Sequence, residues 1–211
     1  LMRPSYQPQM SGAICAACHQ DKNDPDGNGN FEEPNGVVSE PTWEEWLGST
    51  YSNPNSPSYA TCVDCHMPAY GATHAASMGM LTPPTRDSQT IRSHAIKGTS
   101  PVYLENACEL TISAQQTGTT LSVQANVFNN QTGHHVPTGV TVRNVVLLIE
   151  AWRLSDGAAL NSTGTQTVHP LGGVGDPALG YYGGQPGKLF AKHNHDANGV
   201  GPTFYTDATG I

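Results

Sequence analysis

Cys15-Ala16-Ala17-Cys18-His19 and, further along, Cys62-Val63-Asp64-Cys65-His66 are the two stretches of this chain that carry the most information. Both follow the pattern Cys-x-x-Cys-His. This pattern is typical of c-type haem attachment, in which the two thiols bond to the porphyrin and the histidine binds its iron. Two such pentads predict two covalently bound haem c groups. The expected attachment residues are Cys15, Cys18, Cys62 and Cys65, and the expected proximal iron ligands are His19 and His66.

Zinc and disulfides are the alternatives for these cysteines, because Cys-x-x-Cys pairs also occur in zinc sites. The separation between Cys18 and Cys62 is much longer than the usual spacing of about 15–20 residues between the pairs of a zinc ribbon. A histidine also follows each pair directly, which neither a zinc site nor a disulfide requires. The spacing therefore favours haem.

Composition limits the compartment and the partners. The chain has 211 residues, enough for one or two domains, and only 12% of them are charged. Its formal net charge of −8 makes nucleic acid and anionic membrane surfaces unlikely partners. No apolar run is long enough to span a bilayer, and no secretory signal follows Leu1. Because haem of this type is attached outside the cytoplasm, we expect a periplasmic or extracellular protein, read here as processed or truncated.

Residues 1-104 are predicted to form a loop-rich dihaem domain with few short helices, in which the porphyrins supply apolar bulk. One helix can be recognised from its ends. Thr42 and Glu45 have the spacing of a capping box, and Gly48 is a stop signal. Trp43 and Trp46 lie three residues apart and should share one face of this helix.

Residues 105-211 are predicted to form an antiparallel β-sandwich of immunoglobulin-like type, which makes the whole chain α+β with an irregular first part. Apolar and polar residues alternate from Leu110 to Ala114 and from Leu121 to Val127, and a third strand is expected from Val140 to Leu154, with its middle section buried on both faces. The stretch from Leu171 to Ile211 is rich in glycine and poorly periodic. We therefore expect the closing strands beyond Ile211.

The sixth ligand of each iron should be a histidine or a methionine if the haems are low-spin. Seven of the 9 histidines remain besides the proximal pair, and Met67, Met78 and Met80 are the sulfur alternatives. His74, in the loop after the second pentad, is one candidate. His193 and His195 could instead share a face of a strand and bind a metal.

The order of three motifs resembles a group of bacterial and archaeal multihaem c-type cytochromes. The second pentad continues as Cys-His-Met67-Pro68, His94 and Gly98 frame a His-x-x-x-Gly segment, and residues 133–139 read Gly-His-His-Val-Pro-Thr-Gly. That group has CxxCHMP, His-x-Phe-x-Gly and Gly-His-x-x-Pro-Thr-Gly ahead of a β-sandwich. The resemblance implies that His94 and His134 are the distal iron ligands. Ile96 replaces the usual aromatic residue, and His135 is an additional histidine in the last motif.

A calcium site is a second expectation. Asp24, Asp26 and Asn28 occupy the first, third and fifth positions of a calcium loop, and Gly29 the sixth. Position twelve is Asn35 rather than glutamate, so Glu32 or Glu33 would have to replace the missing ligand. The alternative is a solvated acidic turn.

Electron transfer between two six-coordinate haems is the predicted function, with an electron carrier more in keeping with the sequence than an enzyme. The expected partners are redox proteins or an extracellular electron acceptor. Two alternatives remain. The chain could be a subunit of an extracellular cytochrome filament, a homo-oligomer or polymer in which a neighbouring subunit supplies ligands. It could also be a haem oxidoreductase with one open iron site.

Overall fold

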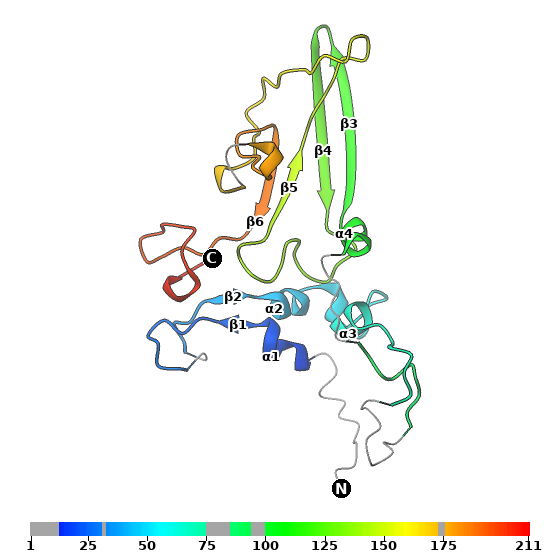
Figure 1. Ribbon diagram of the computed structural model, residues 1–211, viewed down its shortest axis with the longest axis vertical. Helices are drawn as coiled ribbons and strands as arrows, with labels where there is room; N and C mark the ends of the chain where they lie inside the picture. The colour runs from blue at the N-terminus through cyan, green and yellow to red at the C-terminus, as the bar shows by residue number, and fades with distance from the viewer. Residues whose placement is uncertain (1–12, 31–32, 75–84, 94–99, 173–175) are drawn as a thin grey trace. The chain divides into compact units, whose positions relative to one another are not determined.

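Figure 1 shows a computed structural model of the chain, which describes residues 13–30, 33–74, 85–93, 100–172 and 176–211. Short helices and small antiparallel sheets make up its regular structure, so the α+β class is confirmed. Contacts divide the chain into two units. Unit 1 comprises Leu1–Cys18 and Trp43–His135, and unit 2 comprises His19–Thr42 and Val136–Ile211. The domain boundary predicted between residues 104 and 105 stays a prediction.

The helices are short, and local signals explain their ends. They are η2 (Ala13–Cys15), α1 (Ala16–His19), α2 (Thr42–Leu47), η3 (Thr50–Ser52), α3 (Cys62–His66) and α4 (Pro101–Ala107). The helix predicted after Thr42 is therefore confirmed as α2. The rings of Trp43 and Trp46 are stacked with centroids 4.8 Å apart, as their spacing predicted. Helix α4 has Pro101 in its first turn, where the missing N–H has no helical partner to lose.

Unit 1 also contains a long β-hairpin, formed by β3 (Glu109–Thr117) and β4 (Thr120–Phe128). The two strands pair in register from Thr117 opposite Thr120 to Glu109 opposite Phe128. Gly118 makes the turn with a φ of 61°, a conformation that favours glycine. Alternation places the apolar residues on one face, which confirms the pattern read from the sequence. These residues are Leu110, Ile112, Ala114, Val123, Ala125 and Val127.

Unit 2 is built from two further two-stranded antiparallel sheets. One pairs β1 (Asp21–Lys22) with β2 (Val38–Glu40), and the other pairs β5 (Asn144–Leu148) with β6 (Gly187–Ala191). Three single turns complete its regular structure, namely η4 (Pro170–Gly172), η5 (Pro177–Leu179) and η6 (Tyr205–Asp207). Strand β5 is shorter than the strand predicted between Val140 and Leu154. Because each sheet of the described residues has two strands, the immunoglobulin-like sandwich stays a prediction.

Few apolar side chains are fully buried in the part of the chain that the structure describes. Val168 is 0% exposed and Ala208 is 1% exposed, and both belong to unit 2. Val168 lies against Gly172, where an added Cβ would come within 2.8 Å of its Cγ1 atom. Its backbone N–H donates to Gln185 O at 2.8 Å. None of the described helices is both long and apolar enough to cross a membrane.

Replacing Val168 with alanine should lower the free energy of unfolding by about 2 kcal/mol, because it removes two methyl groups from a closed site. Urea unfolding followed by far-UV circular dichroism measures the loss. Leu154→Ala is the matched control, since Leu154 is 101% exposed and its truncation should change stability little. Equal losses in both variants would show that Val168 is not a core residue.

Candidate functional site

The second pentad forms helix α3, which presents its two cysteines and its histidine from one short segment of unit 1. Thr61 precedes the helix, and both its backbone N–H and its hydroxyl donate to Asp64 Oδ2, at 2.8 and 2.7 Å. The other end of α3 is held by Tyr103 of α4, whose hydroxyl donates to Cys65 O at 2.6 Å. The Tyr103 ring lies 5.6 Å from the His66 ring with the planes 16° apart. These contacts fix the backbone from which His66 extends.

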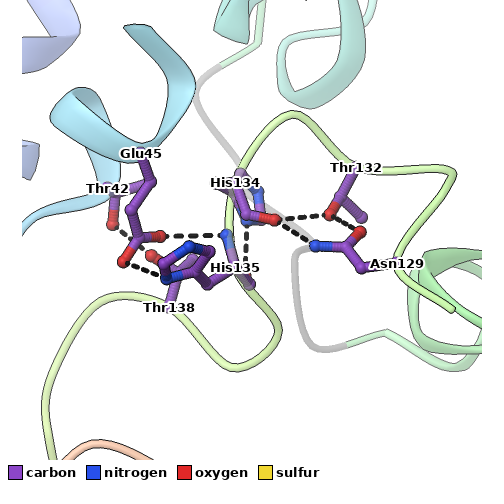
Figure 2. Close-up of polar contacts among 7 residues, drawn as sticks. All are labelled: Thr42, Glu45, Asn129, Thr132, His134, His135 and Thr138. Atoms are coloured by element: carbon purple, nitrogen blue, oxygen red, sulfur yellow. Dashed lines mark hydrogen bonds and ion pairs between the residues drawn. The ribbon is translucent and has the colours of Figure 1, made fainter. Parts of the chain in front are cut away.

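His134 is brought to His66 by the tertiary fold. The centroids of the two imidazole rings are 6.0 Å apart, and their planes differ by 21°. His134 Nδ1 lies 2.9 Å from His135 O (Figure 2). Because a carbonyl oxygen can only accept, Nδ1 is the donor of this contact, and in a neutral imidazole the lone pair is then on Nε2. This is the tautomer of metal-binding histidines, which usually donate their other ring N–H to a carbonyl or carboxylate.

The loop that carries His134 is held on one side by its own polar side chains. Asn129 Nδ2 donates to His134 O at 2.6 Å, and Thr132 Oγ1 lies 2.8 Å from the same oxygen (Figure 2). Gly133 passes close to Trp46 and Tyr51, and an added Cβ would lie 3.0 Å from an atom of each. The absence of a side chain at Gly133 therefore lets the loop approach α2 and η3.

Glu45 of α2 holds the same loop on its other side. Its Oε2 accepts from His135 N at 3.0 Å, and its Oε1 lies 3.2 Å from His135 Nδ1 (Figure 2). The Glu45 side chain is 5% exposed, whereas that of His135 is 71% exposed. In unit 2, the Thr42 hydroxyl lies 2.8 Å from that of Thr138. Both residues of the predicted capping box thus contact the Gly133–Gly139 segment.

A cavity of about 290 Å³ lies between α2, η3 and this loop in unit 1. Glu45, Tyr51, Asn129 and His134 are among the residues that line it. The lining is mostly polar. The geometry therefore gives His134 an ordered polar surrounding on the side of the loop and leaves its Nε2 as the ring's unprotonated nitrogen.

The cysteines of the first pentad lie beside the second pentad in unit 1, whereas His19 belongs to unit 2. Cys15 ends η2, and Cys18 lies on α1. Burial raises the pKa of Cys62 to about 11, and the neighbouring Cys15 thiol adds to the rise through its charge and a hydrogen bond. Burial also raises the pKa of Cys65, with a further contribution from the Asp64 charge. None of the five cysteines is in a disulfide. The two predicted attachment sites are therefore neighbours.

The sulfur atoms of the pentads do not form a zinc site. Four thiolates around one zinc ion, at about 2.3 Å each, would lie about 3.8 Å from one another. Among the described residues, which include both complete pentads, the one group of three or more metal-ligating side chains within 4.8 Å is Asp24, Asp26 and Glu33. Haem attachment to these cysteines stays a prediction.

The structure gives less information about the other predicted iron ligands. His94 lies outside the described residues, as do Met78 and Met80. His74 is half-buried, and its Nδ1 lies 3.0 Å from the Thr73 hydroxyl. No contact among the described residues joins His74 to either pentad. His74 and His94 therefore remain predictions as iron ligands.

Unit 2 contains a pair of histidines that the sequence did not suggest. His193 shares a small cavity of about 290 Å³ with His169, Leu189 and Ala191. Burial lowers the pKa of His193, and the charge of His169 adds to the effect. The predicted partner His195 instead has its Nδ1 3.2 Å from Asp196 O. His169 precedes His193 by 24 positions, so no local spacing could have revealed this pair.

The predicted calcium loop is a tight turn around Asp24, whose carboxylate accepts from the backbone N–H groups of Gly27, Asn28 and Gly29 at 2.9, 3.2 and 2.7 Å. Asn28 also donates to Glu33 Oε1 at 2.7 Å. The structure thus brings Glu33, one of the two expected substitutes, to within 4.8 Å of Asp24 and Asp26. Glu32, the other, lies outside the described residues.

Comparison of the chain with protein-family models, with curated proteins and with solved structures finds no match. The function must therefore be inferred from the pentads and from the geometry around His66 and His134.

Replacing Asp64 with asparagine should weaken the start of α3. Hydrogen bonds from the Thr61 hydroxyl, and then from its backbone, lower the pKa of Asp64. The ionised side chain therefore stabilises the protein above the unfolded pKa of about 3.9, and this contribution is lost as the pH falls through the lower folded value. We expect a loss of about 1 kcal/mol at neutral pH that shrinks on acidification.

Thermal unfolding of both proteins between pH 7 and pH 3 checks this expectation. Glu105→Gln removes an exposed acidic charge from α4 and serves as the control. A difference between Asp64→Asn and wild type that grows on acidification would contradict the assignment.

Proposed function

We propose that this protein is a dihaem c-type cytochrome that transfers single electrons outside the cytoplasm. The separation of the His66 and His134 rings carries the proposal. One iron bound by Nε2 of both rings, at about 2 Å each, would place the ring centroids about 6 Å apart. The centroids are 6.0 Å apart in a stacked arrangement, so the rings are close enough to share an iron, and binding would require both Nε2 atoms to point at it. The tautomer of His134 supports the same conclusion, because its Nε2 has a free lone pair.

Different residues of the chain would hold the two haems. Cys15 and Cys18 would attach one haem, and Cys62 and Cys65 the other. His19 and His66 would be the proximal ligands. Haem iron supplies reversible one-electron chemistry, which the ligands and surroundings tune. Cys15 lies next to Cys62, so the two proposed attachment sites would be adjacent, which would favour electron exchange within the chain.

The compartment, the partners and the second domain follow from the same proposal. Haem attachment of this type places the protein in the periplasm or outside the cell, where redox proteins or an extracellular acceptor would exchange electrons with it. The resemblance to multihaem cytochromes with a β-sandwich supports an immunoglobulin-like module in residues 105-211. The apolar face of the β3–β4 hairpin would belong to the core of that sandwich. The module would serve docking or assembly.

Absorption spectra of the ferric and dithionite-reduced protein, with haem quantified per chain, test the proposal. We expect two low-spin haems. His134→Ala should make one haem high-spin without releasing it, because the cysteines still hold the porphyrin, and His94→Ala should do the same to the other. His169→Ala, in unit 2, is the control and should leave both haems low-spin. Two low-spin haems with unchanged potentials in His134→Ala would end the assignment of His134.

We also propose a calcium site formed by Asp24, Asp26 and Asn28, with Glu33 as the additional carboxylate. Its support is the convergence of three carboxylates within 4.8 Å on a turn closed by backbone N–H groups. Calcium at 100 times its dissociation constant should stabilise the protein by about 2.7 kcal/mol. Asp26→Asn and Glu33→Gln should abolish this gain, and Glu105→Gln should retain it. Calorimetric titration that detects no calcium binding would reject the site.

A further inference from the structure

Glu45 directs its carboxylate at His135. The side chain is 5% exposed, so its charge is largely removed from water. Burying a carboxylate is costly unless hydrogen bonds compensate for the lost hydration. Both oxygens are directed at His135, one at its backbone N–H and one at its ring (Figure 2). Such an arrangement holds the peptide group between His134 and His135 as well as the side chain of His135.

The backbone of His135 also orients the ring of His134. Its carbonyl oxygen accepts the proton of His134 Nδ1 at 2.9 Å (Figure 2). Its N–H donates to Glu45 at 3.0 Å. The same residue therefore connects the buried carboxylate on α2 to the imidazole that faces His66. A change at Glu45 would reach the His134 ring through this residue, although no described contact joins Glu45 to His134 itself.

We propose that Glu45 is a positioning residue that holds the iron ligand His134 in its binding orientation through His135. The inference rests on the proposed dihaem function and adds a residue that neither the pentads nor the resemblance motifs assign to a ligand. Outer partners of metal-binding histidines typically affect metal affinity or activity by about 10–100-fold. A carboxylate that fixes the acceptor of the ring N–H is such a partner, one bond further out.

The exposure of His135 distinguishes the two contacts that Glu45 makes. The His135 ring is 71% exposed, so its pairing with Glu45 is open to water and is worth little by itself. The bond to His135 N holds the peptide group that joins His134 to His135, and the carbonyl that accepts from His134 Nδ1 belongs to the next peptide group of the same residue. His135→Ala removes the ring but keeps the peptide, so it should leave His134 in place. Glu45→Ala removes both contacts, so it should release the loop.

Cyanide binding to the ferric, haem-loaded protein tests this proposal. Cyanide reaches the iron only when the His134 ring leaves it, so the binding rate reports how firmly that ring is held. We expect Glu45→Ala to accelerate cyanide binding at one of the two haems by about 10–100-fold. Its electron paramagnetic resonance spectrum should change for the same haem. His135→Ala and Glu44→Ala, which removes an exposed charge from the same helix, should match wild type.

Glu45→Asp guards against a failure of the alanine variant to fold. Glu45→Asp keeps the charge but shortens the side chain by one methylene, so it should also accelerate cyanide binding. Glu45→Gln should have a smaller effect, because its amide oxygen can still accept from His135 N. Glu45→Asp and Glu45→Ala could instead have wild-type rates and spectra and a lowered melting temperature. This result would show that Glu45 only stabilises the fold. If the wild-type protein lacked low-spin haem altogether, the proposed function would fail, which is a separate outcome.

Discussion

The hydrogen bond from His134 Nδ1 to the carbonyl oxygen of His135 determines what the site can do. A histidine in a loop has two nitrogens and several rotamers, and most combinations cannot bind a metal that lies near His66. The carbonyl acceptor selects one tautomer and one ring orientation. The surrounding contacts then hold that carbonyl in place. Asn129 and Thr132 bind the carbonyl of His134 and Glu45 binds the N–H of His135, so all three hold the peptide group that precedes that carbonyl.

This dependence explains why so many polar groups of unit 1 surround one short loop. Few apolar side chains among the described residues are fully buried, so hydrophobic packing cannot fix a loop to within the fraction of an ångström that a ligand requires. Directional hydrogen bonds can fix a loop to this precision if their donors and acceptors lie on regular elements. Glu45 meets this condition because it lies in α2. The stacked Trp43 and Trp46 of this helix, and its contact with Gly133, set the distance between the helix and the loop.

The sequence predicted the local features well and the long-range ones poorly, for a physical reason. Helix α2 and the β3–β4 hairpin follow from residues that are close in the chain, and both were predicted. Glu45 was predicted to cap its own helix, yet the contacts described here reach His135, 90 residues away. The pairing of His193 with His169 was missed for the same reason. Hydrophobic periodicity records which face of an element is buried but not which distant side chain meets it. His94 and the sandwich stay predictions.

The two pentads illustrate the opposite case, in which local sequence carries almost all of the chemistry. Each needs only five residues, because the thiols and the proximal histidine lie within about one helical turn. The distal ligand has no such constraint and can come from any segment that the fold brings near. Position 134 is 68 residues beyond His66, and its ring still lies 6.0 Å away. Attachment can therefore be read from a motif, whereas spin state and potential depend on tertiary contacts such as those of Glu45. In the proposed dihaem protein, loss of these tertiary contacts would leave the porphyrins attached but remove the distal ligand that sets spin state and potential.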